Sequence, residues 1–150
     1  MTRDRTTMIE YCTFSLDGHL FGVEAERVQE LLRPQALTPV PTAAPVVAGL
    51  MSLRGQIVTA LDLRQRLGLA PLEGQRPMTV VVRREAGTVA LLVDAIGAVV
   101  DVDPADLEAP PETVAGPGRE LILGVHQLPE RLLLILDVDA ATRPGAEVAA

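Results

Sequence analysis

The side chains that could carry out catalysis are few, and their spacing does not support it. His19 and His126 lie far apart in the sequence, and neither has neighbours at metal-ligand spacing. Cys12 stands in an alternating apolar stretch, which predicts a buried and inert thiol. Ser15 and Ser52 lack the strained turn that exposes a nucleophilic serine. The sequence therefore predicts neither nucleophilic catalysis nor a bound metal.

Two further patterns could hold a phosphate group or a metal, but simpler roles explain them. The glycines of residues 116–118 flank a proline and no lysine follows, so they do not form a phosphate-binding loop. Asp-Val-Asp occurs at 101–103 and at 137–139, where helix caps and hairpin ends account for the carboxylates. We expect no cofactor and no enzymatic activity. The alternative is a small β-barrel enzyme or metal protein, which stoichiometric metal in the purified chain would support.

Arg54 is the side chain best suited to bind another protein. It occupies a tight turn between two predicted short strands, and Gly55 beside it allows close approach of a second backbone. A guanidinium group can hold the fold together internally or bind a carboxylate on a partner. The sequence leaves both hypotheses open: a local ion pair with Asp62 or Glu30, or a docking contact.

Length and charge exclude several classes of protein. The chain has 150 residues, 13 basic and 20 acidic, and a net charge of −7. This length is typical of one domain, with room for two small lobes. The acidic balance and the scarcity of aromatic residues argue against nucleic-acid binding. Residues 1–10 show no secretory signal and no apolar run could cross a membrane, so we expect a cytoplasmic protein.

Alternation of polar and apolar residues predicts a mostly β protein. Residues 10–16 alternate, Asp17-Gly18 favours a tight turn, and residues 19–23 return, which together predict a hairpin. Further strands are predicted at 50–53, 56–61, 78–84, 88–94, 97–103, 119–128 and 131–137, with an edge strand or connector in the proline-rich segment 34–45. About ten such strands suit two five-stranded barrels better than one open sheet.

Helices are predicted only as short segments. In residues 24–32 the apolar side chains of Val28 and Leu31 are spaced as on one face of a helix, with Glu30 on the outward side. Asp62 is predicted to cap a second short helix.

Several predicted strands carry apolar residues at consecutive positions, as in residues 80–82 and 132–136. Such strands bury both faces. One face would fill the strand's own barrel, and the other would fill a seam between two barrels. We therefore expect two lobes that pack rigidly, with a groove where they meet. The turn-rich segment 70–77 is the predicted boundary between the lobes.

The central segment resembles the signature of the CheW family, the adaptor proteins of bacterial chemotaxis arrays. The resemblance is carried by residues 46–58, Val-Val-Ala-Gly-Leu-Met-Ser-Leu-Arg-Gly-Gln-Ile-Val, and continues through residues 61–64, Leu-Asp-Leu-Arg. Residues 14–16, 21–23, 28–31, 38–41, 90–93 and 132–137 match as well. The resemblance covers residues 9–141, so residues 1–8 and 142–150 are expected to be flexible tails.

This resemblance implies two SH3-like five-stranded barrels around a third apolar core, and an adaptor without catalysis. It implies binding to the cytoplasmic tip of chemoreceptors, the methyl-accepting chemotaxis proteins, and to the regulatory domain of a CheA-type histidine kinase. It also allows self-association in array rings. The protein would then lie in the cytoplasm, held at the inner face of the membrane by the receptors. The same scaffold role in a non-motility chemosensory pathway is the alternative.

By the same resemblance, six residues face the receptor: Val28, Glu30, Leu31, Arg54, Ile96 and Val99. Glu30 is expected as an exposed carboxylate on the predicted helix, and with Arg54 it would set register and specificity. The apolar positions would supply affinity for the receptor's helical hairpin. No residues are assigned to the kinase contact. Ser52 and Ala95 depart from the family pattern, which usually has Asn and Gly there, and these departures bear on the detail of the groove.

Overall fold

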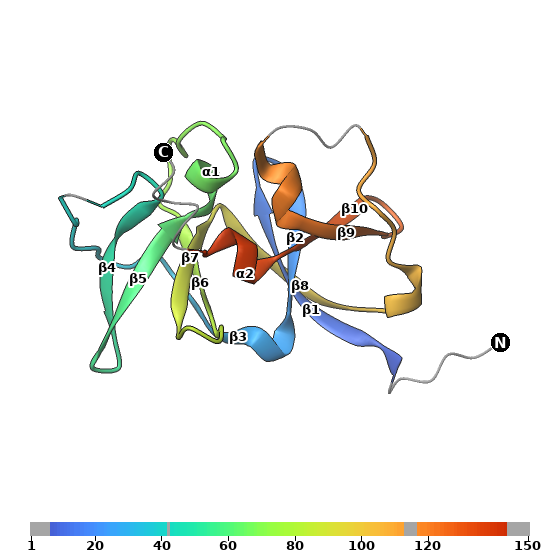
Figure 1. The fold of residues 1–150 in the computed structure, drawn as a ribbon, viewed down its shortest axis with the longest axis horizontal. Coiled ribbons are helices and arrows are strands. Elements are labelled where there is room, and N and C mark those ends of the chain that lie inside the picture. The colour runs from blue at the N-terminus through green and yellow to red at the C-terminus, as the bar shows by residue number, and fades with distance from the viewer. Residues whose placement is uncertain (1–6, 42, 113–116, 144–150) are drawn as a thin grey trace.

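The fold is built from ten strands in two five-stranded sheets, counted over the residues that the structure describes. The computed structural model describes residues 7–41, 43–112 and 117–143. The strand order is β8-β1-β2-β10-β9 in the first sheet and β3-β6-β7-β5-β4 in the second. Figure 1 shows the two sheets side by side, the second on the left and the first on the right.

We call each sheet, together with the short α-helix that follows one of its strands, a lobe: α1 follows β5 and α2 follows β10. The first lobe contains β1 (Ile9–Leu16), β2 (His19–Glu24), β8 (Ala95–Val102), β9 (Ile122–Gln127), β10 (Leu132–Leu136) and α2 (Val138–Ala141). The second lobe contains β3 (Val28–Leu32), β4 (Val47–Leu53), β5 (Gln56–Asp62), α1 (Leu63–Arg66), β6 (Met78–Val82) and β7 (Val89–Val93). Three 3-10 turns complete the described elements: η2 (Ala25–Arg27), η3 (Pro104–Asp106) and η4 (Pro117–Leu121).

Each sheet curls into a barrel in the same way. The chain that leaves outer strand β8 forms a bridge from Glu108 to Val125 on β9, the opposite edge of the first sheet. The chain that leaves outer strand β3 forms a bridge from Thr38 to Leu50 on β4, the opposite edge of the second sheet. Each sheet also contains one parallel pair, β2 with β10 and β5 with β7. The predicted fold of two five-stranded barrels is confirmed, and the lobes are topological equivalents.

The path of the chain differs from the predicted division into lobes. The first lobe combines both ends of the chain, and the second is the continuous middle. The segment 70–77, where we predicted the boundary, joins α1 to β6 inside the second lobe. The chain passes between the lobes at η2 and again at Asp94. Composition identifies turns, but long-range parallel pairing decides which strands share a sheet.

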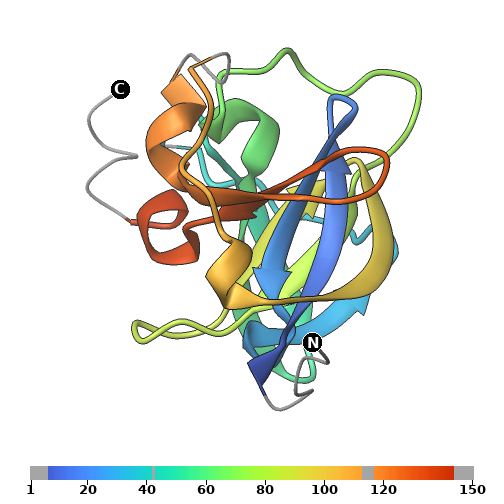
Figure 2. The same cartoon turned by 90° about the vertical axis from the view of Figure 1, so that its right-hand side faces the viewer.

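A shared apolar core joins the lobes. Alternate residues of β7 and β10 point to opposite sides: Leu91 and Leu134 enter the central core, whereas Leu92 and Leu133 enter the interior of their own barrel. The central core contains side chains from both sheets. The consecutive apolar residues therefore bury both faces of these strands, as predicted. Figure 2 looks onto the first lobe, whose strands curl in front of the second.

The helix predicted for residues 24–32 is wrong. Glu24 is the last residue of β2, and the rest form η2 and then β3, which pairs antiparallel with β6. A β-bulge between Val28 and Glu30 inserts one residue into the strand, so that the apolar residues at 28, 31 and 32 acquire helical spacing. Glu30 therefore stands on a strand. The strand predicted at 119–128 begins only at Ile122, because η4 precedes it.

Aspartate side chains cap the N-termini of the short helices, as the sequence predicts. The Asp62 carboxylate accepts hydrogen bonds from the backbone N–H groups of residues 64 and 65 and caps α1. Asp103 and Asp137 cap η3 and α2 in the same way, which accounts for one carboxylate of each Asp-Val-Asp sequence. Thr142 is buried and its hydroxyl donates to the Val138 carbonyl oxygen at 2.7 Å, so the packed structure reaches this residue. Within the predicted tails, residues 1–6 and 144–150 lie outside the described residues.

Candidate docking surface

Arg54 and Glu30 form an ion pair at the surface. Arg54 Nη2 lies 2.7 Å from Glu30 Oε1, and Nε lies 3.3 Å from Oε2. The turn between β4 and β5 presents the guanidinium, with φ of 50° at Arg54 and 83° at Gly55. Holding a non-glycine residue in this left-handed region costs about 1 kcal/mol. Of the two local partners that the sequence allowed, the structure selects Glu30, because Asp62 caps α1.

The ion pair holds both groups in their charged forms. The Arg54 hydrogen bond lowers the pKa of the Glu30 carboxyl, and Glu30 raises the pKa of Arg54. The Arg54 side chain is mostly exposed to solvent. A guanidinium has five N–H donors, and Glu30 engages only two of its three nitrogen atoms. Local pairing and docking are therefore compatible, since the pair presents a fixed fork to a partner's carboxylate.

The four apolar positions divide between the two outer strands. Val28 on β3 and Ile96 on β8 are half-buried, and both pack against the central core. Leu31 on β3 is 42% exposed and Val99 on β8 is 53% exposed. Each strand thus carries one residue anchored in the shared core and one that presents apolar surface to solvent.

Cys12 lies beside Val99, although its alternating apolar stretch predicts a buried side chain. Its predicted burial is wrong: the residue is partly exposed, and it lies directly across from Val99 in the pairing of β1 with β8. Burial, and then the charge of Glu10, raise the pKa of the thiol, so it stays protonated at neutral pH. The alternation of β1 is intact, because its register with β2 is continuous and Cys12 shares the face of Phe14, but that face is not fully covered at Cys12.

The histidines have structural surroundings. His126 is buried, with its ring centroid 6.2 Å from that of Tyr11. Burial lowers its pKa, although Asp106 and other carboxylates oppose this effect. Among the residues that the structure describes, no cluster of three or more His, Cys, Asp or Glu side chains could hold a metal ion. Over the same residues, no helix is long and apolar enough to span a bilayer.

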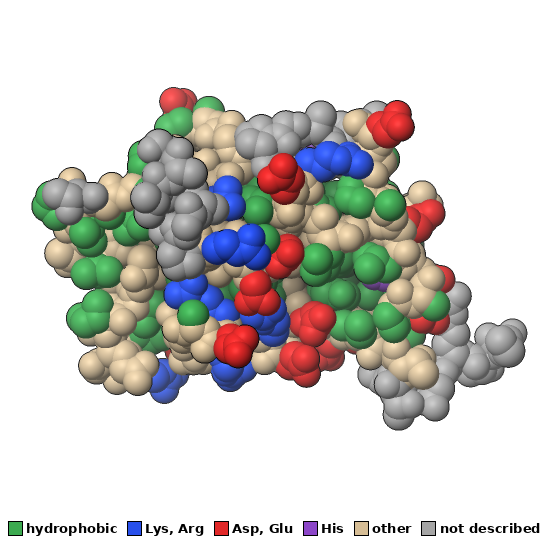
Figure 3. Space-filling model, viewed as in Figure 1, with side chains coloured by type: hydrophobic (Ala, Val, Ile, Leu, Met, Phe, Trp, Pro, Cys, Tyr) green, Lys and Arg blue, Asp and Glu red, His purple; other side chains and the backbone are tan. Residues whose placement is uncertain are grey.

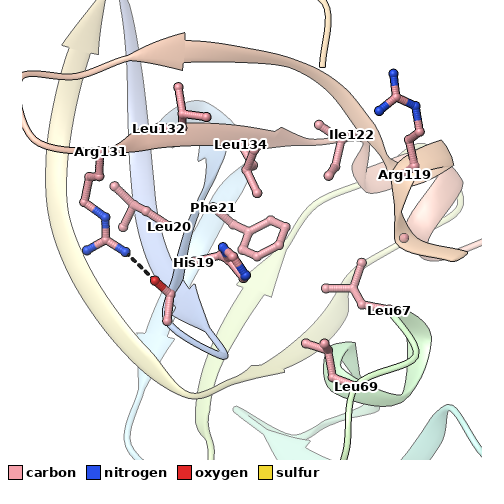
Figure 4. A pocket seen from close by; sticks show the side chains of 12 residues that line it. His19, Leu20, Phe21, Leu67, Leu69, Arg119, Ile122, Arg131, Leu132 and Leu134 are labelled. Carbon is pink, nitrogen blue, oxygen red and sulfur yellow. Dashed lines mark hydrogen bonds between the residues drawn. The ribbon is translucent and has the colours of Figure 1, made fainter. Parts of the chain in front are cut away.

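A cavity of about 490 Å³ lies away from these residues, between the end of α1 and the first lobe. Figure 4 shows its apolar walls, including Phe21, Leu67 and Leu134, with Arg131 at one side. Arg131 Nη2 donates to the Gly18 carbonyl oxygen at 2.9 Å. None of the six predicted receptor-facing residues lines this cavity. Its wall at Gly118 and Arg119 follows residues 113–116, which lie outside the described residues, and we assign it no ligand.

Comparison with known proteins agrees with this architecture. The model of the family described as CheW-like domain matches residues 10–143. The chain is 30% identical over 131 residues to "Chemotaxis protein CheW" of Treponema pallidum, covering 84% of this chain and 77% of that protein. It is 28% identical to the protein of the same name from Bacillus subtilis, covering 93% of this chain and 90% of the relative.

A solved structure shows the same fold. The crystal structure of the scaffolding protein TtCheW from Thermoanaerobacter tengcongensis superposes with a TM-score of 0.77 at 23% identity. The match covers 85% of this chain and 88% of that chain. At this level of identity the likeness establishes the arrangement of strands in both lobes.

Proposed function

We propose, on the premise that this chain belongs to the CheW-like domain family, that its outer strands β3 and β8 form the surface on which a chemoreceptor tip docks. The family membership makes the chain a non-catalytic scaffold of chemotaxis signalling, and the family interacts with receptors and with CheA. Residues 9–141 would form the single domain that performs this role. Our proposal adds the docking surface on this chain, the parts of the receptor and the kinase that it brings together, and the place in the cell where it acts.

The position of Leu31 carries the proposal. This exposed apolar residue pairs with Val80 of the shared core, whereas Glu30 before it pairs with Val81 of the barrel interior. The apolar side chain and the ion pair with Arg54 therefore stand on the two faces of the outer strand β3. Val99 presents a second exposed apolar side chain on β8. A receptor tip is a helical hairpin, and an amphipathic helix binds through apolar contacts whose register nearby charges select. Leu31 and Val99 would supply affinity, and Glu30 with Arg54 would select the partner.

The scaffold would bring the receptor to the regulatory domain of a CheA-type kinase in the cytoplasm, near the inner face of the membrane. Regulation would then depend on position, because the chain offers no catalytic group of its own. Array rings could also contain contacts between copies of this chain. We assign no residues to the kinase contact.

Binding of a soluble receptor-tip fragment to variants of the chain tests the docking surface. Val99→Asp places a charge at the proposed surface, whereas Leu123→Asp makes the same change at an exposed leucine on β9. We expect Val99→Asp to weaken binding at least about tenfold, because a carboxylate would replace apolar contact, and Leu123→Asp to leave it unchanged. Equal affinities for both variants and the wild type would reject the surface.

A further inference from the structure

Both outer strands begin at an ion pair made with the opposite lobe. β8 belongs to the first lobe, and Asp94 immediately before it binds Arg64 of α1 in the second lobe. β3 belongs to the second lobe, and Arg27 immediately before it binds Asp139 of α2 in the first lobe. We call these two ion pairs the crossed anchors.

The anchor of β8 is the more enclosed of the two. Arg64 Nε lies 2.7 Å from Asp94 Oδ1, and Nη2 lies 2.8 Å from Oδ2. The two side chains are 12% and 13% exposed. Arg64 Nη1 also donates to the Ala70 carbonyl oxygen at 2.7 Å. The Asp17 backbone N–H donates to Asp94 Oδ2 at 2.8 Å, which joins the β1–β2 turn to the same cluster.

The anchor of β3 is bidentate but open to solvent. Arg27 Nη2 lies 2.9 Å from Asp139 Oδ1, and Nη1 lies 3.3 Å from Oδ2. Arg27 Nε donates to the Arg83 carbonyl oxygen. The Asp139 side chain is 62% exposed. Figure 3 shows charged side chains gathered across the middle of this face, where α2 lies between the lobes.

We infer that Arg64 and Asp94 are positioning residues of the docking surface: their ion pair fixes the start of β8 against the second lobe, and so sets where Ile96 and Val99 lie relative to β3. A bidentate fork restrains both distance and orientation, which a single contact with a lysine would not. Ile96 lies two residues beyond Asp94, so little chain is available to absorb a displacement. This inference rests on the proposed function for its consequence in binding.

The reactivity of Cys12 reports whether β8 is displaced, and measuring it needs no receptor. Cys12 is the chain's one cysteine, and it lies across from Val99 in the β1–β8 pairing. Release of the start of β8 should expose the thiol. We expect Asp94→Asn to accelerate alkylation of Cys12 by a maleimide severalfold, and to weaken binding of the receptor-tip fragment about tenfold. Arg64→Lys keeps the positive charge but removes the bidentate guanidinium, so we expect smaller changes in the alkylation rate and in the affinity. This variant provides the same test if Asp94→Asn does not fold.

A control separates positioning from general stability. Met51→Ala removes buried side chain from the interior of the second barrel, away from both anchors. At equal loss of stability it should change neither the alkylation rate nor the affinity. If the anchor variants also leave both unchanged, the inference is overturned and the docking surface stands. If they accelerate alkylation while the affinity stays at the wild-type value, β8 is positioned by the pair but is not the docking surface, which overturns both proposals.

Discussion

The two lobes place different residues at equivalent positions after β5 and β10, the strands that form the parallel pairs of the two sheets. In the second lobe β5 leads through Asp62 into Leu63 and Arg64 of α1, and in the first β10 leads into Asp137-Val138-Asp139. The first residue of each triplet caps the helix, and the second is buried. The third residue binds the segment that crosses to the other lobe, with a cation in one lobe and an anion in the other.

The fold fixes where the third residue of each triplet lies, whereas the type of residue decides which charge it carries. The strand–cap–helix geometry brings the third position to the crossover in both lobes, whichever charge it carries. Burial then decides the strength of the contact. The Arg64–Asp94 pair is largely shielded, whereas Asp139 is exposed. An enclosed bidentate pair loses much more on removal of one partner than an exposed pair, which contributes about 0–1 kcal/mol.

Removal of one partner from each anchor gives the largest expected difference. Arg64→Gln should lower the free energy of unfolding by about 2 kcal/mol, because Asp94 is left largely buried without its cation. Arg27→Gln should lower it by about 0.5 kcal/mol. Urea denaturation measures both values. Equal losses would show that burial does not distinguish the two anchors.

Two buried threonines extend the comparison to the barrel walls. The Thr13 hydroxyl on β1 donates to the Ala98 carbonyl oxygen. Thr79 on β6 is buried, and its Oγ1 has no hydrogen-bond partner among the described residues. Thr79→Val should therefore stabilise the protein by about 1 kcal/mol, and Thr13→Val should destabilise it by about the same amount. Thermal unfolding provides the measurement, and a shift of the same sign in both variants would contradict the assignment.

Acid sensitivity should show the smallest difference between the lobes. Arg64 lowers the pKa of Asp94, and Arg27 lowers that of Asp139. A carboxyl whose pKa is lower in the folded state stabilises the fold above its unfolded pKa of about 3.9, and loses that contribution as pH falls through the folded value. Asp94→Asn should therefore flatten the decline of stability below about pH 4, and Asp139→Asn should flatten it less. Identical profiles for the two variants would argue against this ranking.

Local features of the fold could be predicted from the sequence. The Asp17-Gly18 hairpin and the cap at Asp62 depend on neighbouring residues, so their signals are contiguous. β3 could not be identified, because its bulge gave the apolar residues helical spacing. The origin of the first lobe from both chain ends depends on the parallel pairing of β2 with β10, for which short segments carry no signal.

The site was predicted unevenly for the same reason. Arg54 could be selected from its turn, and Glu30 was one of two local partners considered. The place of Cys12 opposite Val99 and the crossed anchors could not be predicted, because each depends on a contact between segments distant in sequence. The six receptor-facing residues remain predictions, supported by the exposure of Leu31 and Val99 on the two outer strands.

Protection of Cys12 by a bound receptor would show whether the hairpin docks on β3 and β8. The wild-type chain needs no engineering, since its one cysteine faces Val99 across β1 and β8. The measurement is the rate of maleimide alkylation with and without a saturating receptor-tip fragment. A docked receptor hairpin should slow the reaction at least about tenfold by covering the surface. An unchanged rate at saturation would contradict docking on β3 and β8.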